Sequence, residues 1–142
     1  MGNYSKSLLQ TLRNNRGAVY ALWPAPAIGS GAEGVQVDSG ANVYSALEDI
    51  IAAGAIVTPF WLAGLVVYTT DVIQDFHVRL YDATLAAYRA DFEFHPTLVT
   101  LNIAPMFLPI PVYEAANSQI QAMCGGAAAR TLRLHVIYMT GI

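Results

Sequence analysis

IIAAGAIVTPFWLAGLVVYTT, residues 50–70, contains no charged side chain and is long enough to cross a bilayer as a helix, which takes about 20 apolar residues. Pro59 lies in the middle of the run and would cost such a helix about 3 kcal/mol. The nearest basic residues are Arg16 and Arg79, so no positive charge flanks the run as it flanks membrane spans. A strand buried on both faces over residues 59–70 accounts for the same composition. We therefore expect these residues in the core of the protein, with no membrane as partner.

Short segments of alternating apolar and polar residues surround this run, and such alternation predicts β-strands. Residues 43–54 also suit a helical face, but the glycines on both sides favour a strand. Three prolines within residues 105–111 predict an edge strand or a connection there. We expect strands at residues 34–40, 43–54, 59–70, 75–83, 86–95, 98–104, 119–124 and 130–139. About eight strands with turn residues between them are typical of an all-β fold, an antiparallel β-sandwich.

The alternation also assigns an inner and an outer face to most of these strands. Polar side chains such as His77, Arg79 and Glu93 are expected outside. The side chains expected inside are Phe76, Val78, Leu80, Tyr88, Ala90, Phe92, Phe94, Val99, Leu101, Ile103, Ile120, Ala122, Cys124, Leu132, Leu134, Val136 and Tyr138.

The first 34 residues differ from the rest, and we expect an N-terminal arm (1–34) on a β-sandwich domain (35–142). Residues 3–14 are compatible with a short helix, and residues 17–34 are rich in Ala, Gly and Pro, which favours an extended segment. All charges before Glu33 are positive, whereas the remainder carries ten acidic residues against four arginines, a net charge of −6. A basic arm on an acidic body suggests docking on a neighbour, with a solvated terminus as the alternative. The expected partner-binding residues are Lys6, Arg13, Arg16 and Trp23, although Trp23 could instead pack on its own domain.

Composition indicates that part of the surface is covered. The 142 residues are 55% apolar and only 12% charged, against about 25% charged in an average soluble domain. Sister subunits or a larger assembly would cover such a surface, so a homo-oligomer is expected. The net charge of −3 argues against nucleic acid as a partner. The single cysteine, Cys124, excludes an internal disulfide and suits a reducing compartment, and Pro24 and Pro26 interrupt the apolar part of a would-be signal peptide.

No motif for catalysis, a metal or a cofactor is found in the sequence. The three histidines, His77, His95 and His135, could form a metal site across strands, but their polar-face positions favour solvated side chains. Asp91 and Glu93 resemble a glycosidase pair only in spacing, and ordinary cross-strand pairing explains them. Cys124 is expected to be a small core residue. The protein is therefore not expected to be an enzyme or to hold a cofactor.

The C-terminal half suggests a family. PIPVYEAANSQIQAMCGGAAARTLRLHVIYM, residues 109–139, contains a proline-broken connection, an Ala-Asn-Ser turn, a strand, a Gly-Gly break and a closing strand. With residues 40–54 (GANVYSALEDIIAAG) and 60–68 (FWLAGLVVY) as early strands, this layout resembles the small jelly-roll virion proteins of tailed bacteriophages, of the capsid decoration (cement) type. The likeness covers residues 35–142, is one of layout, and is shared by other phage jelly rolls in tails and baseplates.

This resemblance implies a non-enzymatic structural virion protein that clamps the major capsid protein or other virion proteins, commonly as a homotrimer, after assembly in the host cytoplasm. One alternative is a carbohydrate-binding module or tail-fibre head, with Tyr81, Tyr113 and Trp23 available to stack on sugars. Another is a small membrane protein such as a holin, which depends only on residues 50–70.

Overall fold

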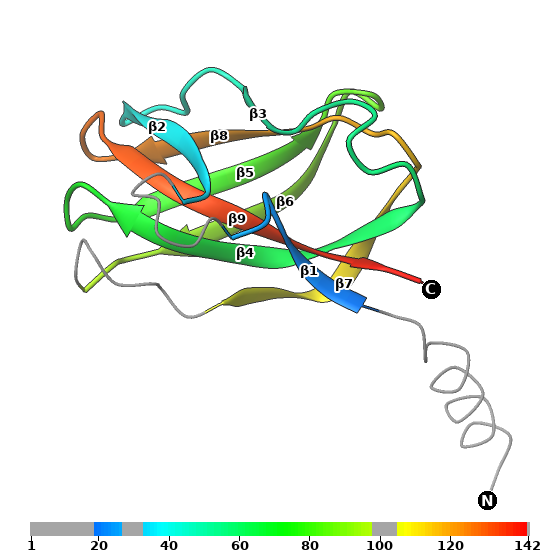
Figure 1. The fold of residues 1–142 in the computed structure, drawn as a ribbon. Helices are drawn as coiled ribbons and strands as arrows, with labels where there is room; N and C mark the ends of the chain where they lie inside the picture. Colours follow the sequence, from blue (N-terminus) through cyan, green and yellow to red (C-terminus); the bar gives the residue numbers. More distant parts are fainter. Residues whose placement is uncertain (1–18, 27–32, 98–104, 142) are drawn as a thin grey trace, which may run out of the picture.

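The computed structural model describes residues 19–26, 33–97 and 105–141, and in these ranges it contains nine β-strands and no helix (Figure 1). The all-β prediction is confirmed, with nine strands where about eight were expected. The predicted helix at residues 3–14 and the predicted strand at residues 98–104 lie outside the described residues. The strands are β1 (Val19–Trp23), β2 (Val35–Ala41), β3 (Glu48–Ile51), β4 (Phe60–Thr70), β5 (Phe76–Asp82), β6 (Ala87–Phe94), β7 (Met106–Glu114), β8 (Ile120–Gly126) and β9 (Thr131–Thr140).

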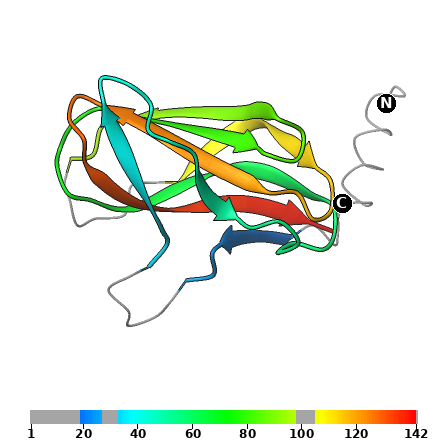
Figure 2. The ribbon, with the colours of Figure 1, turned by 90° about the horizontal axis from the view of Figure 1, so that it is seen from above.

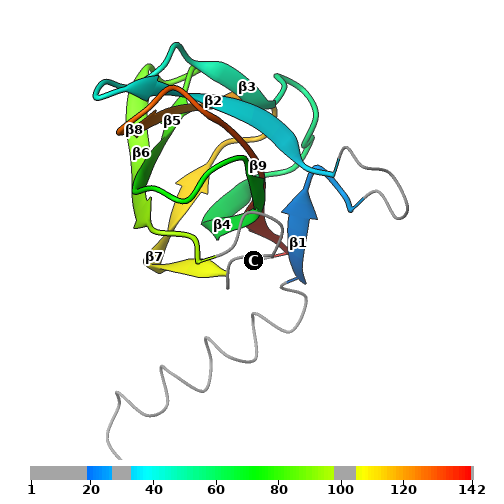
Figure 3. The same ribbon diagram turned by 90° about the vertical axis from the view of Figure 1, so that its left-hand side faces the viewer.

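Seven strands follow one another in the order β6-β5-β8-β2-β9-β4-β7, and β6 and β7 approach each other so that the sheet nearly closes into a barrel (Figure 3). β1 also pairs with β9, and β3 also pairs with β8. We call β1, β4, β7 and β9 the β4 sheet, and β3, β5, β6 and β8 the β5 sheet. β2 joins the two, because its first residues pair with β9 and its last residues pair with β8.

The expectation of a wholly antiparallel arrangement is wrong at one pairing. Residues 39–41 of β2 run parallel to residues 124–126 of β8, whereas every other described strand pair is antiparallel. The reason is that β2 passes from the β4 sheet to the β5 sheet without turning, and there it meets a strand that runs in its own direction. The result is a mixed sheet.

The interior is built around β4, as the charge-free run predicts. Pro59 directly precedes the strand, a position where its missing N–H is tolerated. β4 pairs with β9 on one side and β7 on the other, and a bulge at Ala63–Gly64 interrupts both ladders. Gly64 is required there, because a Cβ would collide with the carbonyl oxygen of Met106. The fully buried side chains from this run are Ile51, Phe60, Leu62, Leu65 and Val67. In the described part of the chain, no helix is long and apolar enough to cross a membrane.

The predicted inner faces are confirmed on β5 and β9, where Phe76, Val78, Leu80, Leu132, Leu134, Val136 and Tyr138 all belong to or pack on the core. On β6 the prediction is wrong for Tyr88, which is 60% exposed. The register between β5 and β6 shifts at Leu80/Tyr81, so Arg89 becomes an extra residue opposite β5 and Tyr88 moves to the outer face beside Tyr81. A strand slip of one residue always exchanges the two faces.

The expected arm is partly integrated into the body. β1 pairs with residues 136–140 of β9, on the same side of β9 that β2 occupies further along (Figures 1 and 2). β1 ends at Trp23, and β2 begins at Val35. Two other segments differ in length from expectation: of residues 43–54 only β3 is a strand, and the proline-rich β7 is a strand of nine residues at the end of the sheet order, where an edge was predicted.

Candidate functional site

The outward side of the β4 sheet carries a continuous set of uncharged side chains, which we call the outer apolar face. Alternate residues of β4 and β9 point away from the main core and form a second, smaller cluster around Ala63, Ile137 and Met139. Aromatic rings of β1 and β7 extend this cluster across the neighbouring strands. The members are Tyr20, Leu22, Trp61, Ala63, Val66, Phe107, Tyr113, Ile137 and Met139.

Three aromatic side chains of the outer apolar face are largely open to solvent. Tyr20 and Phe107 are each 61% exposed, although their rings meet edge to face with centroids 6.3 Å apart. Tyr113 is 51% exposed and contacts Trp61 in the same way, at 5.1 Å. Exposed aromatic clusters of this kind are typical of surfaces that bind another protein.

The outward side of the β5 sheet is different, because charged and titratable groups pair across β5 and β6. His95 Nδ1 lies 2.8 Å from Asp75 Oδ1, His77 Nε2 lies 3.4 Å from Glu93 Oε1, and Arg79 Nε donates to Asp91 Oδ1 at 2.6 Å. The hydrogen bond to Asp91 raises the pKa of Arg79 above its ordinary value. These pairs confirm the cross-strand interpretation of Asp91 and Glu93.

Two tyrosine rings complete this side. The guanidinium carbon of Arg79 lies 4.6 Å from the ring centre of Tyr44 and 4.8 Å from that of Tyr88. Such stacking holds the cation over the electron-rich faces of the rings. The side chain of Arg79 therefore holds the rings of Tyr44 and Tyr88 in place on the outward side of the β5 sheet.

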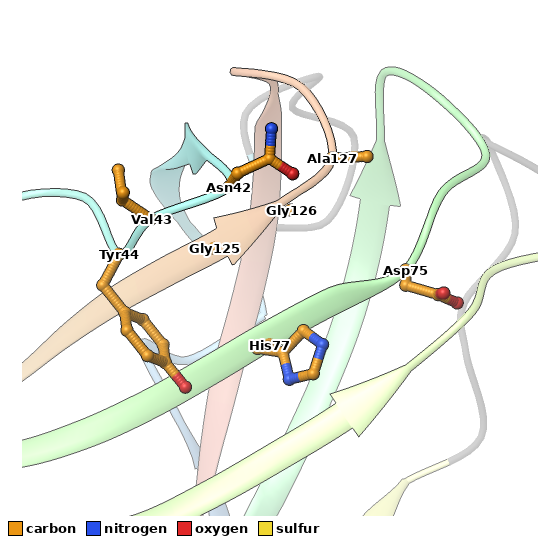
Figure 4. Close-up of a pocket in the computed structure, with 8 residues that line it drawn as sticks. All are labelled: Asn42, Val43, Tyr44, Asp75, His77, Gly125, Gly126 and Ala127. Atoms are coloured by element: carbon orange, nitrogen blue, oxygen red, sulfur yellow. The ribbon is translucent and has the colours of Figure 1, made fainter.

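A pocket of about 390 Å³ opens at one end of the outward side of the β5 sheet (Figure 4). It lies between the loop after β2 and the start of β5, over the last residues of β8. The backbone N–H groups of Asn42 and Ser45 bind the loop to β8, donating to the carbonyl oxygens of Gly126 (2.7 Å) and Cys124 (2.8 Å). The pocket is lined by Asn42, Val43, Tyr44, Asp75, His77, Gly125, Gly126 and Ala127.

A buried polar cluster, which we call the seam, lies where β6 and β7 approach. Asp82, at the end of β5, and Glu114, at the end of β7, are both fully buried, and each carboxyl group shifts the pKa of the other. Arg89 Nε donates to Glu114 Oε1 at 2.6 Å, and Arg89 Nη2 donates to the carbonyl oxygen of Tyr113 at 2.8 Å. The backbone N–H groups of Thr84 and Leu85 donate to Asp82 Oδ1. The seam therefore joins the edge strands of both sheets through side chains.

The pKa values of the two carboxyl groups of the seam are shifted in opposite directions. Burial, together with the hydrogen bond to Asp82, raises the pKa of Glu114 to about 8, despite the opposing effect of Arg89. Burial alone would raise the pKa of Asp82 as well, but hydrogen bonds from Glu114, Leu85 and Thr84 lower it overall. A pKa of about 8 favours the neutral form of Glu114 at pH 7, whereas the lowered pKa of Asp82 favours its carboxylate.

The residues predicted to bind a partner are divided by the structure. Lys6, Arg13 and Arg16 lie outside the described residues, so their role stays a prediction. Trp23 packs on its own domain, the alternative named for it above: its Nε1 donates to the carbonyl oxygen of Ile50 at 3.0 Å and its ring meets that of Tyr138.

The histidines do not come together. His77 and His95 lie on the outer side of the β5 sheet, as predicted. The prediction is wrong for His135, which is only 2% exposed, because the chain around Pro24 and Glu33 crosses the outer side of β9. His135 Nδ1 donates to the carbonyl oxygen of Pro24 at 2.8 Å, and Nε2 lies 3.7 Å from Glu33 Oε1. Within the described ranges, no group of three His, Cys, Asp or Glu side chains could hold a metal ion.

Cys124 is a buried core residue, as predicted, and burial raises the pKa of its thiol to about 12. No local pattern in the sequence indicates the seam, because Asp82 and Glu114 are separated by a long stretch of chain and only the closure of the barrel brings them together. The outer apolar face was also not predicted. A signal was present, since β4 and the end of β9 are apolar at both odd and even positions.

Comparison with known proteins gives no match at any of three levels. No protein-family model, no curated protein and no solved structure matches this chain. The function proposed below therefore depends on the residues and geometry described above.

Proposed function

We propose that this chain is a non-enzymatic structural subunit of a bacteriophage particle, a capsid decoration protein that binds the major capsid protein as a homotrimer. The observation that carries the proposal is the outer apolar face, where Tyr20, Phe107 and Tyr113 are exposed together. We further propose that the two sheets joined by β2 are a variant of the jelly-roll sandwich. The trimer, the virion location and the phage origin depend on the resemblance of layout described above.

The physical support is the unfavourable exposure of these rings to water. Burying apolar surface contributes about 25 cal/mol per Å², and large aromatic side chains provide most of that area in protein interfaces. A partner that covers the outer apolar face would remove the exposure. Several contacts on a shell would increase the overall affinity further. Once the first contact of a subunit has formed, each further contact is almost intramolecular.

Two measurements test this function. Sedimentation of the purified protein should show a trimer that Phe107→Ser weakens and Tyr88→Ser leaves intact, since the two side chains are equally exposed on opposite sheets. Particles that carry the protein should withstand a higher temperature than particles without it. A monomer whose removal leaves particle stability unchanged contradicts the proposal, and a trimer without effect on the shell points to a tail or fibre component.

The alternative of a sugar-binding module loses part of its original support. Of the three aromatic residues expected to stack on sugars, Trp23 packs on its own core and Tyr81 packs against Tyr88. Tyr113 remains exposed, but it belongs to the outer apolar face. A sugar site on this protein would have to lie elsewhere.

A further inference from the structure

Gly125 and Gly126, at the end of β8, line the pocket and are closely approached by neighbouring residues. A Cβ on Gly125 would lie 3.1 Å from the carbonyl oxygen of Val43, and a Cβ on Gly126 would collide with the side-chain amide of Gln74. The loop is held from the other side by Ser45, whose Oγ accepts a hydrogen bond from the N–H of Cys124 at 3.1 Å. These hydrogen bonds hold the loop side of the pocket on the end of β8.

The groups around the pocket combine hydrogen-bonding capacity with an aromatic ring. Figure 4 shows Asn42 and Tyr44 on the loop side and Asp75 and His77 on the β5 side. The amide, hydroxyl and imidazole groups both donate and accept hydrogen bonds, whereas the carboxylate of Asp75 only accepts. The ring of Tyr44 and the side chains of Val43 and Ala127 supply the apolar part.

We propose that this pocket binds a neutral saccharide. A sugar ring presents hydroxyl groups that need both donors and acceptors at its rim, and C–H groups that pack against an aromatic ring. An anionic ligand would face the carboxylates of Asp75 and, beside His77, Glu93. A wholly apolar ligand would cover the polar side chain of Asn42 without offering it a hydrogen bond. The volume of about 390 Å³ lies near the lower end for ligand pockets, which suits one or two sugar rings.

This inference goes beyond the structural role and does not depend on it. The pocket lies on the β5 sheet, and the outer apolar face lies on the β4 sheet. A subunit attached through the outer apolar face would keep its pocket open to the surroundings. Such a subunit would let a particle hold carbohydrate on the surface of a cell.

The test uses the full chain, saturation-transfer NMR as readout, and sialic acid and lysine amide as charged comparison probes. The neutral probes are the methyl glycosides of glucose, galactose, mannose and N-acetylglucosamine. We expect binding of at least one of them, weakened tenfold or more by Tyr44→Ala and by His77→Ala. Ile110→Ala, which changes an exposed apolar residue of the opposite sheet, should bind as the unaltered chain does. Tyr44→Phe keeps the ring and therefore separates loss of the hydroxyl group from any loss of folding, which a proton spectrum of each variant checks.

Three results would overturn the proposal. They are the absence of binding to all four glycosides at tens of millimolar, binding that survives both Tyr44→Ala and His77→Ala in folded protein, and binding of only the charged probes sialic acid or lysine amide. None of these results bears on the sedimentation of Phe107→Ser, so failure of the sugar site and failure of the structural role can be told apart.

Discussion

The two outer sides of this barrel are built from strands of the same kind and yet differ in chemistry. On the β4 sheet the outward positions of β4 and β9 are filled by Trp61, Ala63, Val66, Ile137 and Met139. On the β5 sheet the outward positions of β5 and β6 are filled by paired acids and bases. A sheet with one solvated side normally shows the second pattern. The first pattern indicates a side that a partner covers, and β1 extends this side through Tyr20 and Leu22.

The strongest test of the difference between the inner and outer sides of β4 is to place a carboxylate on each side in turn. Leu65 is fully buried inside, and its neighbour Val66 lies on the outer apolar face. Leu65→Asp should unfold the protein, because an unpaired buried carboxylate costs several kcal/mol against a total stability of about 5–15 kcal/mol. Val66→Asp should remain folded but lose association. Circular dichroism and sedimentation measure both. If Val66→Asp unfolds as completely as Leu65→Asp, the two sides of β4 do not differ.

The next largest effect concerns the seam, which belongs to neither outer side. Because the pKa of Glu114 is about 8 when folded and near 4.5 when unfolded, the folded protein holds an extra proton between these values. The free energy of unfolding should therefore decrease, by a few kcal/mol at most, as pH rises from about 4.5 to 8, and stay low above that. Asp82 acts in the opposite sense, and its contribution is lost only as pH falls below its ordinary pKa of 3.8.

Glu114→Gln provides the control for this pH dependence. Urea unfolding at pH 5, 7 and 9 should give a steep decrease for the unaltered protein and a much flatter profile for the variant. An unchanged slope in Glu114→Gln would show that other groups cause the dependence.

A smaller effect is expected from β1, the strand of the β4 sheet that pairs with the end of β9. Trp23→Phe keeps an aromatic ring in the core but removes the hydrogen bond to the carbonyl oxygen of Ile50. The loss should be about 1 kcal/mol in urea unfolding, the typical contribution of one such bond. Trp61→Phe, on the outward side of the same sheet, is the matched control and should lower the free energy of unfolding by less. Equal losses would mean that Trp23 does not hold β1 through its indole N–H.

The smallest effect should come from the β5 sheet. Arg79→Gln removes the ion pair with Asp91, whose carboxylate is largely exposed, and exposed ion pairs contribute little to stability. We expect no measurable shift in the thermal midpoint, and the same for Asp91→Asn. A clear drop in either variant would show that this side is a structural surface rather than a solvated one.

The sequence predicted the inner faces well because burial and strand alternation follow the same period of two. It placed the core run correctly from Pro59 and the missing charges, and it placed the proline-rich edge. The prediction failed where the strand register, or a segment that crosses over a strand, determines whether a side chain is buried. Tyr88 moved outward because of a bulge, and His135 was buried because the segment around Pro24 crosses β9. Neither event leaves a local pattern in the residues concerned. The pocket likewise depends on contacts between Gly125, Gly126 and a distant loop.

The position of β7 has a consequence for how copies of this chain can associate. An open strand at the end of a sheet is a template on which further chains add by backbone hydrogen bonds, and this leads to uncontrolled fibrous growth. β7 contains Pro109 and Pro111, which lack the N–H groups that such growth requires, and its register against β4 is broken beside them. Aggregation along the strand edge is thereby suppressed, while contact through the side chains of the sheet stays open. The chain can thus carry an unusually apolar surface and still form assemblies of limited size.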